Sequence, residues 1–391
     1  MAWRYADHRA PFLAGVVASI TGTAASAGLV LAALTSLGAT KSQTTSGIVV
    51  LIALYGLLSI ILSTRYKMPI SIVWSTPGAA LLISSGTLGL SFSSAIGAFM
   101  VTGALLVLTG LWPALGRLVS SIPKPIASAM LAGVIFNFCI APFKSAVDFP
   151  WIVLPAILAW LVLYRFATIW ATPVAMVIIF TLTAIDRGII VKASEILPTM
   201  EFVAPTFDLA AIVSIGIPLY LVTMASQNIP GIAIMKTFGY EVPFKPVMAA
   251  TGSAAILASI FGGFSMNLAA ITAALNANDH AHKDPSRRWL ASVYGGYFYL
   301  VIALFAGVTV AFVLQAPREL VLAAAGLALL GTIISALSGA VEVPELRLPA
   351  MVTFLVTASG ISAFGIGSAF WALVAGLIVL GWLSLKTKTL S

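Results

Sequence analysis

Charged residues are scarce in this chain. Only 8% of its 391 residues are Asp, Glu, Lys or Arg, whereas roughly a quarter are charged in a typical soluble domain. Cysteine is scarcer still, and the single Cys139 excludes a disulfide within the chain. All twelve acidic residues and all three histidines lie outside the apolar spans predicted below. An enzyme working inside a membrane needs a titratable pair at that depth, so we expect no enzymatic activity.

Metal ligands are also few. His280 and His282 are flanked by acidic residues in the segment 276–288. No third ligand follows at a spacing typical of metal sites. We therefore interpret this segment as a solvated inner loop or gate, and we expect neither a metal nor another cofactor.

Long apolar runs are what the chain has in abundance, because 60% of its residues are hydrophobic. Many runs approach the roughly 20 residues of a membrane-spanning helix. We predict an all-α polytopic membrane protein with about 14 spans. The first run lacks a small-x-small exit, so we interpret it as a span and not as a cleaved signal. Predicted spans 1 to 7 are 11–37, 44–62, 69–85, 95–111, 125–143, 149–164 and 170–185. Predicted spans 8 to 14 are 209–235, 246–261, 262–275, 289–314, 320–340, 350–364 and 367–385.

The two halves of the chain, 1–190 and 205–391, resemble repeats. The segment P-K-P-I at 123–126 opens an apolar run, as P-R-E-L does at 317–320. Seven spans in each half would place the second repeat upside down in the membrane. Two inverted seven-span repeats are typical of secondary transporters.

The basic residues test this topology. With a cytoplasmic N-terminus, fifteen of the twenty Lys and Arg fall on the inner side. Five fall outside: Lys41, Lys144, Arg187, Lys192 and Arg318. This bias follows the positive-inside rule and places both termini in the cytoplasm. It also explains the net charge of +8 without a nucleic-acid partner.

Spans 3 and 10 look like broken helices. Each begins as a short extended run, continues with small polar residues and ends as an apolar helix. We predict that Thr76 caps the first of these helices, with Pro77 in its first turn, and that Asn267 caps the second. Irregular backbone survives inside a bilayer only where protein buries it or where it lines a cavity. Broken helices in corresponding halves therefore indicate a transporter binding site.

Facing helix N-termini with no acid nearby favour an anion, and apolar and aromatic walls favour a small organic one. The candidate substrate-binding residues are Trp74, Ser75, Thr76, Gln227, Asn228, Phe264, Ser265 and Asn267. Two alternatives remain for the amides Gln227 and Asn228: they line the cavity, or they bond the backbone freed by Pro230. The aromatic residues Trp74 and Phe264 either stack on the ligand or pack within the protein.

Several motifs carry a family resemblance. They are W-S-T-P-G-A-A-L-L (74–82), L-V-T-M-A-S-Q-N-I-P-G-I-A (221–233), A-A-I-T-A-A (269–274), R-R-W-L-A (287–291), V-T-F-L-V-T-A-S-G (352–360) and G-I-G-S-A-F-W (365–371). The chain resembles the bacterial benzoate–proton symporter family over nearly its whole length. It is more distantly similar to the fold of nucleobase transporters and sulfate permeases. That fold implies a core domain of spans 1–4 and 8–11, and a gate domain of spans 5–7 and 12–14 that also mediates homodimers.

The resemblance implies a secondary active transporter of a small aromatic carboxylate, benzoate, with proton symport, in the bacterial inner membrane. The alternatives are a carrier or channel for another anion, such as sulfate or a dicarboxylate, or a nucleobase carrier of the same fold. Nucleobase carriers place carboxylates at positions that match Gln227 and Met266, which disfavours a nucleobase here. The proton then travels on an edge residue, Asp208, Glu342 or Glu345, or on the substrate's own carboxyl.

Overall fold

The two predicted broken helices meet at the centre of the structure. The computed structural model describes residues 2–24, 26–112, 122–191, 198–269, 271–361, 363 and 367–387. Strand β1 (Ile72–Trp74) pairs antiparallel with β2 (Met266–Leu268), with Val73 opposite Asn267. A short helix follows each strand, α4 (Thr76–Ser85) after β1 and α14 (Ile271–Ala277) after β2. The predicted extended starts are therefore confirmed, and their pairing joins the two halves of the chain.

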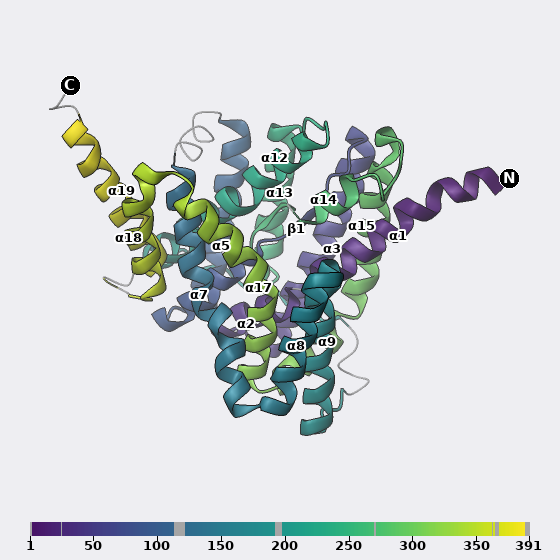
Figure 1. Ribbon diagram of the computed structural model, residues 1–391, viewed down its shortest axis with the longest axis horizontal. Helices are drawn as coiled ribbons and strands as arrows, with labels where there is room; N and C mark the ends of the chain where they lie inside the picture. The colour runs from purple at the N-terminus through teal and green to yellow at the C-terminus, as the bar shows by residue number, and fades with distance from the viewer. Residues whose placement is uncertain are drawn as a thin grey trace.

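Helices make up most of the rest (Figure 1). In the first half they are α1 (Ala2–Ala24), α2 (Ala27–Ser36), α3 (Lys41–Tyr66), α5 (Phe92–Leu111), α7 (Lys124–Asp148), α8 (Pro150–Phe166) and α9 (Thr168–Arg187). In the second half they are α10 (Leu209–Ala211), α11 (Ile217–Thr223), α12 (Ile229–Thr237), α13 (Phe244–Ser259), α15 (Trp289–Leu304), α16 (Ala306–Gln315), α17 (Arg318–Val341), α18 (Arg347–Ala358) and α19 (Ser368–Thr387).

Local sequence explains several helix starts. The Thr40 hydroxyl accepts a hydrogen bond from Gln43 N and the Gln43 side chain accepts one from Thr40 N, so a capping box begins α3. Pro123 and Pro317 precede α7 and α17, the two helices that open the similar segments of the two halves. These two helices pack against each other along their length.

The predicted span 8 is one continuous helical segment with two wide turns. These π-helical turns cover Ile212–Gly216 and Met224–Asn228, and each ends two residues before a proline, Pro218 or Pro230. Proline lacks the N–H for an i−4 bond and its ring clashes with that carbonyl. A π-turn absorbs the mismatch, and such turns occur frequently at functional sites.

Two predicted spans are interrupted. The first divides into α1 and α2 around Ser26, whose hydroxyl donates to Gly22 O over 2.8 Å. The eleventh bends by 54° between α15 and α16. Hydrophobic length alone does not reveal such breaks, because the residues on both sides are equally apolar.

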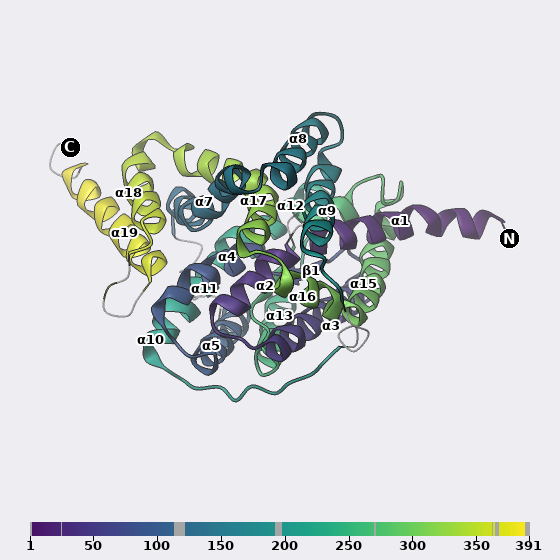
Figure 2. The ribbon, with the colours of Figure 1, turned by 90° about the horizontal axis from the view of Figure 1, so that it is seen from below.

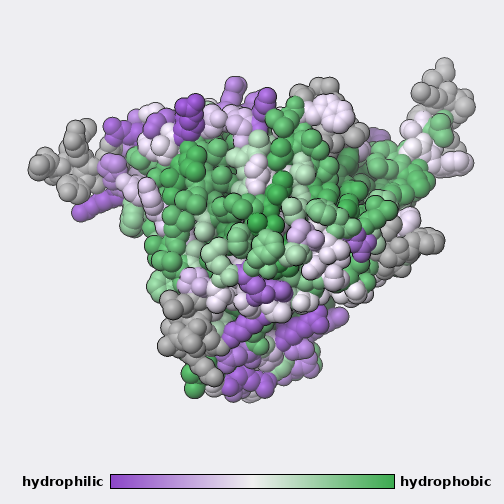
Figure 3. Space-filling view, turned by 180° about the vertical axis from the view of Figure 1, so that it is seen from behind, coloured by the Kyte–Doolittle hydropathy of each residue, from purple (hydrophilic) through white to green (hydrophobic). Residues whose placement is uncertain are grey.

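Seven helices of the described chain are long and apolar enough to cross a membrane, or eight if α15 and α16 count as one bent span. Hydrophobic residues cover the broad middle of the face in Figure 3, and hydrophilic residues gather at its upper edge and lower end. This is the surface of a multi-pass membrane protein. The count of fourteen spans stays a prediction.

Contacts between distant segments agree with the predicted sides. Lys67 Nζ lies 3.8 Å from the centre of the Trp289 ring, and both residues are predicted on the inner side. Ser145 Oγ donates to Glu319 O over 3.0 Å, and both are predicted on the outer side. The start of α1 and the end of α19 lie toward the same upper side in Figure 1, while α8 and α9 form a hairpin near the bottom. Arg117, Lys192 and Lys388, which enter the charge bias, lie outside the described residues.

Cysteine labelling tests which side faces the cytoplasm. In a Cys139→Ala background, Ser286→Cys is expected to resist a membrane-impermeant thiol reagent in intact cells, whereas Lys144→Cys is expected to react. Both positions are exposed in the structure. Labelling is measured by a mass shift, with permeabilised cells as the control in which both react. Reaction of Ser286→Cys in intact cells would show that the predicted topology is inverted.

The segment predicted as a solvated loop is mostly exposed but anchored. Arg288 is only 9% exposed, and its guanidinium donates to Ala277 O and His282 O, both over 2.7 Å. Hydrogen bonds from the side chain and backbone of Ser286 lower the pKa of the Asp284 carboxyl. The loop is thus tied to the end of α14 rather than loosely attached.

Candidate functional site

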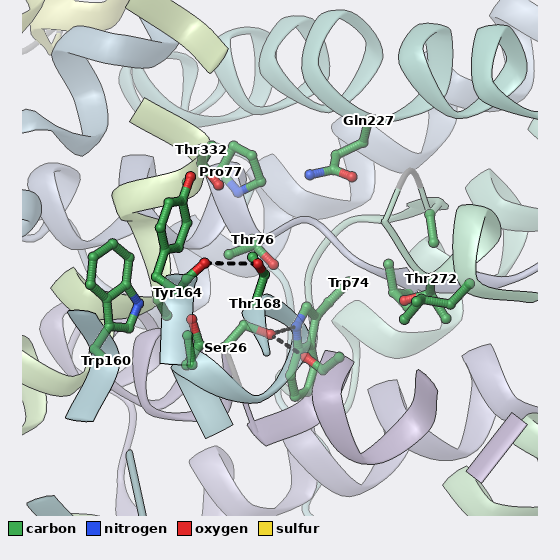
Figure 4. A pocket seen from close by; sticks show the side chains of 18 residues that line it. Ser26, Trp74, Thr76, Pro77, Trp160, Tyr164, Thr168, Gln227, Thr272 and Thr332 are labelled. Atoms are coloured by element: carbon green, nitrogen blue, oxygen red, sulfur yellow. Dashed lines mark hydrogen bonds between the residues drawn. The ribbon is translucent and has the colours of Figure 1, made fainter. Parts of the chain in front are cut away.

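A cavity of about 340 Å³ lies beside the paired strands. One side comes from β1, the first turn of α4, the π-turn at Met224–Asn228 and α14. The other side comes from α8, α9 and α17 (Figure 4). Figure 2 shows the ribbons of these helices, which contact one another. The volume is within the range of small-molecule sites, about 300–1,000 Å³.

The helix cap at α4 is Ser75 and not Thr76 as predicted. Ser75 has an extended backbone, and its Oγ accepts from Gly78 N over 3.1 Å. Thr76 is already the first helical residue, and it lines the cavity with Pro77. Ala79 N donates to Ser75 O over 2.8 Å, and Pro77 has no N–H. The first turn of the ten-residue helix α4 therefore leaves one N–H group, that of Thr76, without an intrahelical partner at the cavity.

The prediction that Asn267 caps the second helix is wrong. Asn267 lies within β2, and α14 begins only at Ile271. Pairing with β1 keeps the chain extended through Leu268, because strand pairing requires an extended backbone at these residues. Asn267 is fully buried, and its Nδ2 donates to Leu268 O over 3.1 Å. It does not line the cavity.

The adjacent amides Gln227 and Asn228 have different surroundings. Gln227 lines the cavity, and Figure 4 shows its amide pointing into it. Asn228 is fully buried, with its Oδ1 accepting from Leu268 N over 2.9 Å. Its side chain thus holds β2 against the π-turn and does not bond the backbone freed by Pro230. The π-turn gives the two side chains these separate directions.

Three hydroxyls join the paired segments behind the cavity. Thr223 Oγ1 donates to Ser75 Oγ over 3.1 Å and lies 3.0 Å from Ser265 Oγ. The backbone Ser75 N also donates to Ser265 O over 3.2 Å. All three side chains are fully buried. Ser75 and Ser265 therefore hold the two paired segments together and do not line the cavity.

The two predicted aromatic residues also differ. Trp74 lines the cavity, and its indole N–H donates to Ser26 Oγ over 2.7 Å. Phe264 is fully buried and packs near Phe99, with ring centres 6.2 Å apart. Phe264 is therefore a packing residue, and Trp74 alone of this pair faces the cavity.

Sequence reasoning missed the residues of the opposite wall. These are Trp160 and Tyr164 from α8, Thr168, Ala171 and Thr172 from α9, and Ala328, Gly331 and Thr332 from α17. It also missed Gly22, Ser26 and Thr272 on the near side. The spacing of Trp160 and Tyr164 shows that they share a helix face, but it does not show what that face meets.

The described lining of the cavity carries no acidic, basic or histidine side chain. Asp208 caps α10 by accepting from Ala210 N over 2.8 Å. Glu342 pairs with Lys124 over 2.6 Å at an exposed surface, and Glu345 is exposed. Neutral donors therefore supply the polarity of the cavity: the Thr76 N–H at the start of α4, the Gln227 amide and several hydroxyls.

Comparison with known proteins identifies the family. Residues 7–382 match the family model described as benzoate membrane transport protein. The chain is 40% identical over 367 residues to the inner membrane protein YdcO of Escherichia coli (strain K12), covering 93% of each chain. It is 34% identical over 323 residues to the benzoate membrane transport protein of Acinetobacter baylyi (strain ATCC 33305 / BD413 / ADP1), covering 82% of this chain and 81% of that one.

The chain belongs to the benzoate membrane transport protein family. It is therefore a membrane transporter and not an enzyme. Its fold is shared with solved transporters of low sequence identity. The transmembrane domain of a cyanobacterium bicarbonate transporter, BicA, superposes with a TM-score of 0.61 at 15% identity, covering 94% of this chain and 97% of that one. The murine anion transporter Slc26a9 in its inward-facing state gives a TM-score of 0.55 at 15% identity, covering 97% and 69%.

Substitutions of Asn228 and Gln227 are expected to differ in their effect on stability. Asn228→Leu removes the acceptor for a buried backbone N–H, which costs about 1–3 kcal/mol, so the unfolding temperature in detergent is expected to fall. Gln227→Leu is expected to leave that temperature nearly unchanged, because this side chain faces the cavity. Thermal unfolding of both variants measures the difference. Equal unfolding temperatures would contradict the role of Asn228 in holding β2.

Proposed function

We propose that this protein is a secondary active transporter of a small aromatic carboxylate, benzoate, which it carries with a proton across a bacterial inner membrane. The observation that carries the proposal is the cavity itself. It combines Gln227 and Thr76, at the start of α4, with the aromatic rings of Trp74, Trp160 and Tyr164. Convergent neutral donors suit a carboxylate, and apolar rings suit the rest of an aromatic acid. The names of the family and of the Acinetobacter relative support the same substrate class.

We also propose two inverted seven-span repeats that form a core and a gate. The paired strands, α4 and α14 would belong to the core, and α8, α9 and α17 would belong to the gate. The position of the cavity between these two groups supports the division. Relative movement of the two groups would then open the cavity to alternate sides, as expected of a secondary transporter.

The proton would travel on the carboxyl of the substrate. Asp208, Glu342 and Glu345 all lie away from the lining of the cavity, which supports this route over an edge carboxylate. We expect Asp208→Asn, Glu342→Gln and Glu345→Gln each to keep uptake driven by a pH gradient. Loss of accumulation in one variant that still exchanges substrate would identify that residue as the proton carrier.

Uptake by proteoliposomes tests the substrate class. Labelled benzoate, sulfate, succinate and uracil are compared with and without an alkaline interior. We expect only benzoate to accumulate faster than it does in protein-free liposomes, and only with the gradient. Accumulation of sulfate or succinate in its place would indicate a carrier of another anion. Equilibration of benzoate without any response to the gradient would indicate a channel.

A further inference from the structure

One wall of the cavity is a pair of stacked rings on α8. Trp160 and Tyr164 are four residues apart and so share a face of this helix. Their ring centres are 4.8 Å apart and their planes differ by 21°. Both line the cavity, and 42% of Tyr164 remains exposed. The pair therefore keeps ring surface that the surrounding helices do not cover, and part of it lines the cavity.

Gln227 and Thr272 lie across the cavity from these rings, whereas the hydroxyls of Thr168, Thr172 and Thr332 lie on the ring side. Figure 4 shows Trp160 and Tyr164 on one side and Gln227 and Thr272 on the other. Thr76 lines the space between the two sides. A ligand with an anionic head at the polar groups would extend its body toward α8. The placement of the Gln227 amide opposite the two rings thus suits a molecule with a polar head and a flat apolar body.

The Trp160 ring is held in place before any ligand arrives. It packs against a buried cluster from α8, α9 and α17 that includes Val153, Ile179 and Leu327. A ring fixed in this way loses little conformational freedom when a ligand packs on it. Aromatic surfaces favour a flat ring in an offset-stacked or edge-to-face arrangement over a saturated ring of similar size.

We propose that Trp160 and Tyr164 are specificity-determining residues that form the surface for the ring of the substrate. This inference rests on the proposed function, and it assigns the choice between aromatic and saturated carboxylates to α8. The carboxylate is held from the side of α4 and the ring from the side of α8. A bound substrate therefore bridges the two groups of helices, which a smaller anion without a ring does not do.

Comparing two acids with the same head group distinguishes ring stacking from simple burial of apolar surface. Benzoate and cyclohexanecarboxylate both carry one carboxylate on a six-membered ring, but only benzoate is flat and aromatic. The KM of labelled benzoate and the inhibition constant of cyclohexanecarboxylate are measured in proteoliposomes. For Trp160→Leu we expect the benzoate KM to rise about tenfold, with less than a threefold change for cyclohexanecarboxylate. Trp160→Phe is expected to restore most of the preference for benzoate.

The chain offers a matched control on the same helix. Trp151 is 88% exposed at the start of α8 and does not line the cavity. Trp151→Leu is expected to leave both constants unchanged. Tyr164→Leu provides a second test at a more exposed site, and we expect it to raise the benzoate KM in the same direction. Its result decides the matter if Trp160→Leu does not fold.

The outcomes distinguish this inference from the proposed function. Unchanged benzoate kinetics in the folded leucine variants would overturn the inference alone. An equal loss for both acids would also overturn it, because the rings would then supply only apolar volume. A wild-type protein that takes up neither acid would overturn the proposed function, and the inference with it.

Discussion

Replacing Gln227 by Glu is expected to abolish benzoate uptake at neutral pH. The substitution keeps the size of the side chain but places a negative charge in a cavity proposed to hold a carboxylate. Two unit charges about 4 Å apart repel by about 4 kcal/mol at an effective dielectric constant of about 20. The expected loss is therefore at least a hundredfold in the initial rate of labelled benzoate uptake, measured in proteoliposomes under a fixed pH gradient.

A neutral substitution at the same position is the control. Gln227→Met keeps the volume and removes the amide, so we expect a loss of less than tenfold, as for one neutral hydrogen bond. The unfolding temperatures of both variants should stay close to that of the wild type, because the side chain lines a cavity. Uptake by the Glu variant at the wild-type rate would show that the carboxylate binds away from Gln227.

Replacing Gly47 by Val is expected to prevent folding. A Cβ at Gly47 would lie 2.4 Å from Gly262 O and 2.6 Å from Gly262 C. Gly262 has φ +89° and precedes β2, so it cannot retreat without moving the strand. Overpacking costs typically about 1–3 kcal/mol and occasionally more, and the upper end applies here because the contact is with backbone. We expect most of the monodisperse peak of a fluorescent fusion to be lost in size-exclusion chromatography.

Gly331 provides the contrast. A Cβ there meets no atom within 4 Å, although this glycine lines the cavity. Gly331→Val is expected to fold and to elute as the wild type does, with slower uptake because its side chain narrows the cavity. If Gly47→Val were as well folded as Gly331→Val, the close contact between α3 and the turn before β2 would not be required.

The sequence predicts which segments form the site better than it predicts which side chains line the cavity. Small polar residues followed by an apolar run located both α4 and α14. The choice of cap failed because Ser75 and Thr76 are both good caps, and the backbone angles decide between them. Asn267 failed for a different reason. It stays extended because it pairs with a strand about 190 residues away, and no local pattern carries that information.

The opposite wall was missed for a related reason. Trp160 and Tyr164 lie in an apolar helix whose composition fits contact with lipid or protein equally well. Only the packing of α8 beside α9 and α17 places these rings at the cavity. The different roles of Gln227 and Asn228 were equally hard to predict from the sequence. The two side chains point in different directions because of the π-turn at Met224–Asn228, which forms just before Pro230.

The described lining of the cavity carries no charged side chain. The charge of the bound substrate therefore decides whether the membrane voltage affects transport. If the site moves as proposed, its described lining would carry no side-chain charge through the electric field, and the return of the unloaded transporter would be insensitive to voltage. A benzoate anion entering alone would lose about 2.3 kcal/mol against each 100 mV, interior negative. With one proton on its carboxyl, as proposed, the same molecule would cross as a neutral acid. Transport would then respond to the pH gradient and produce no net current.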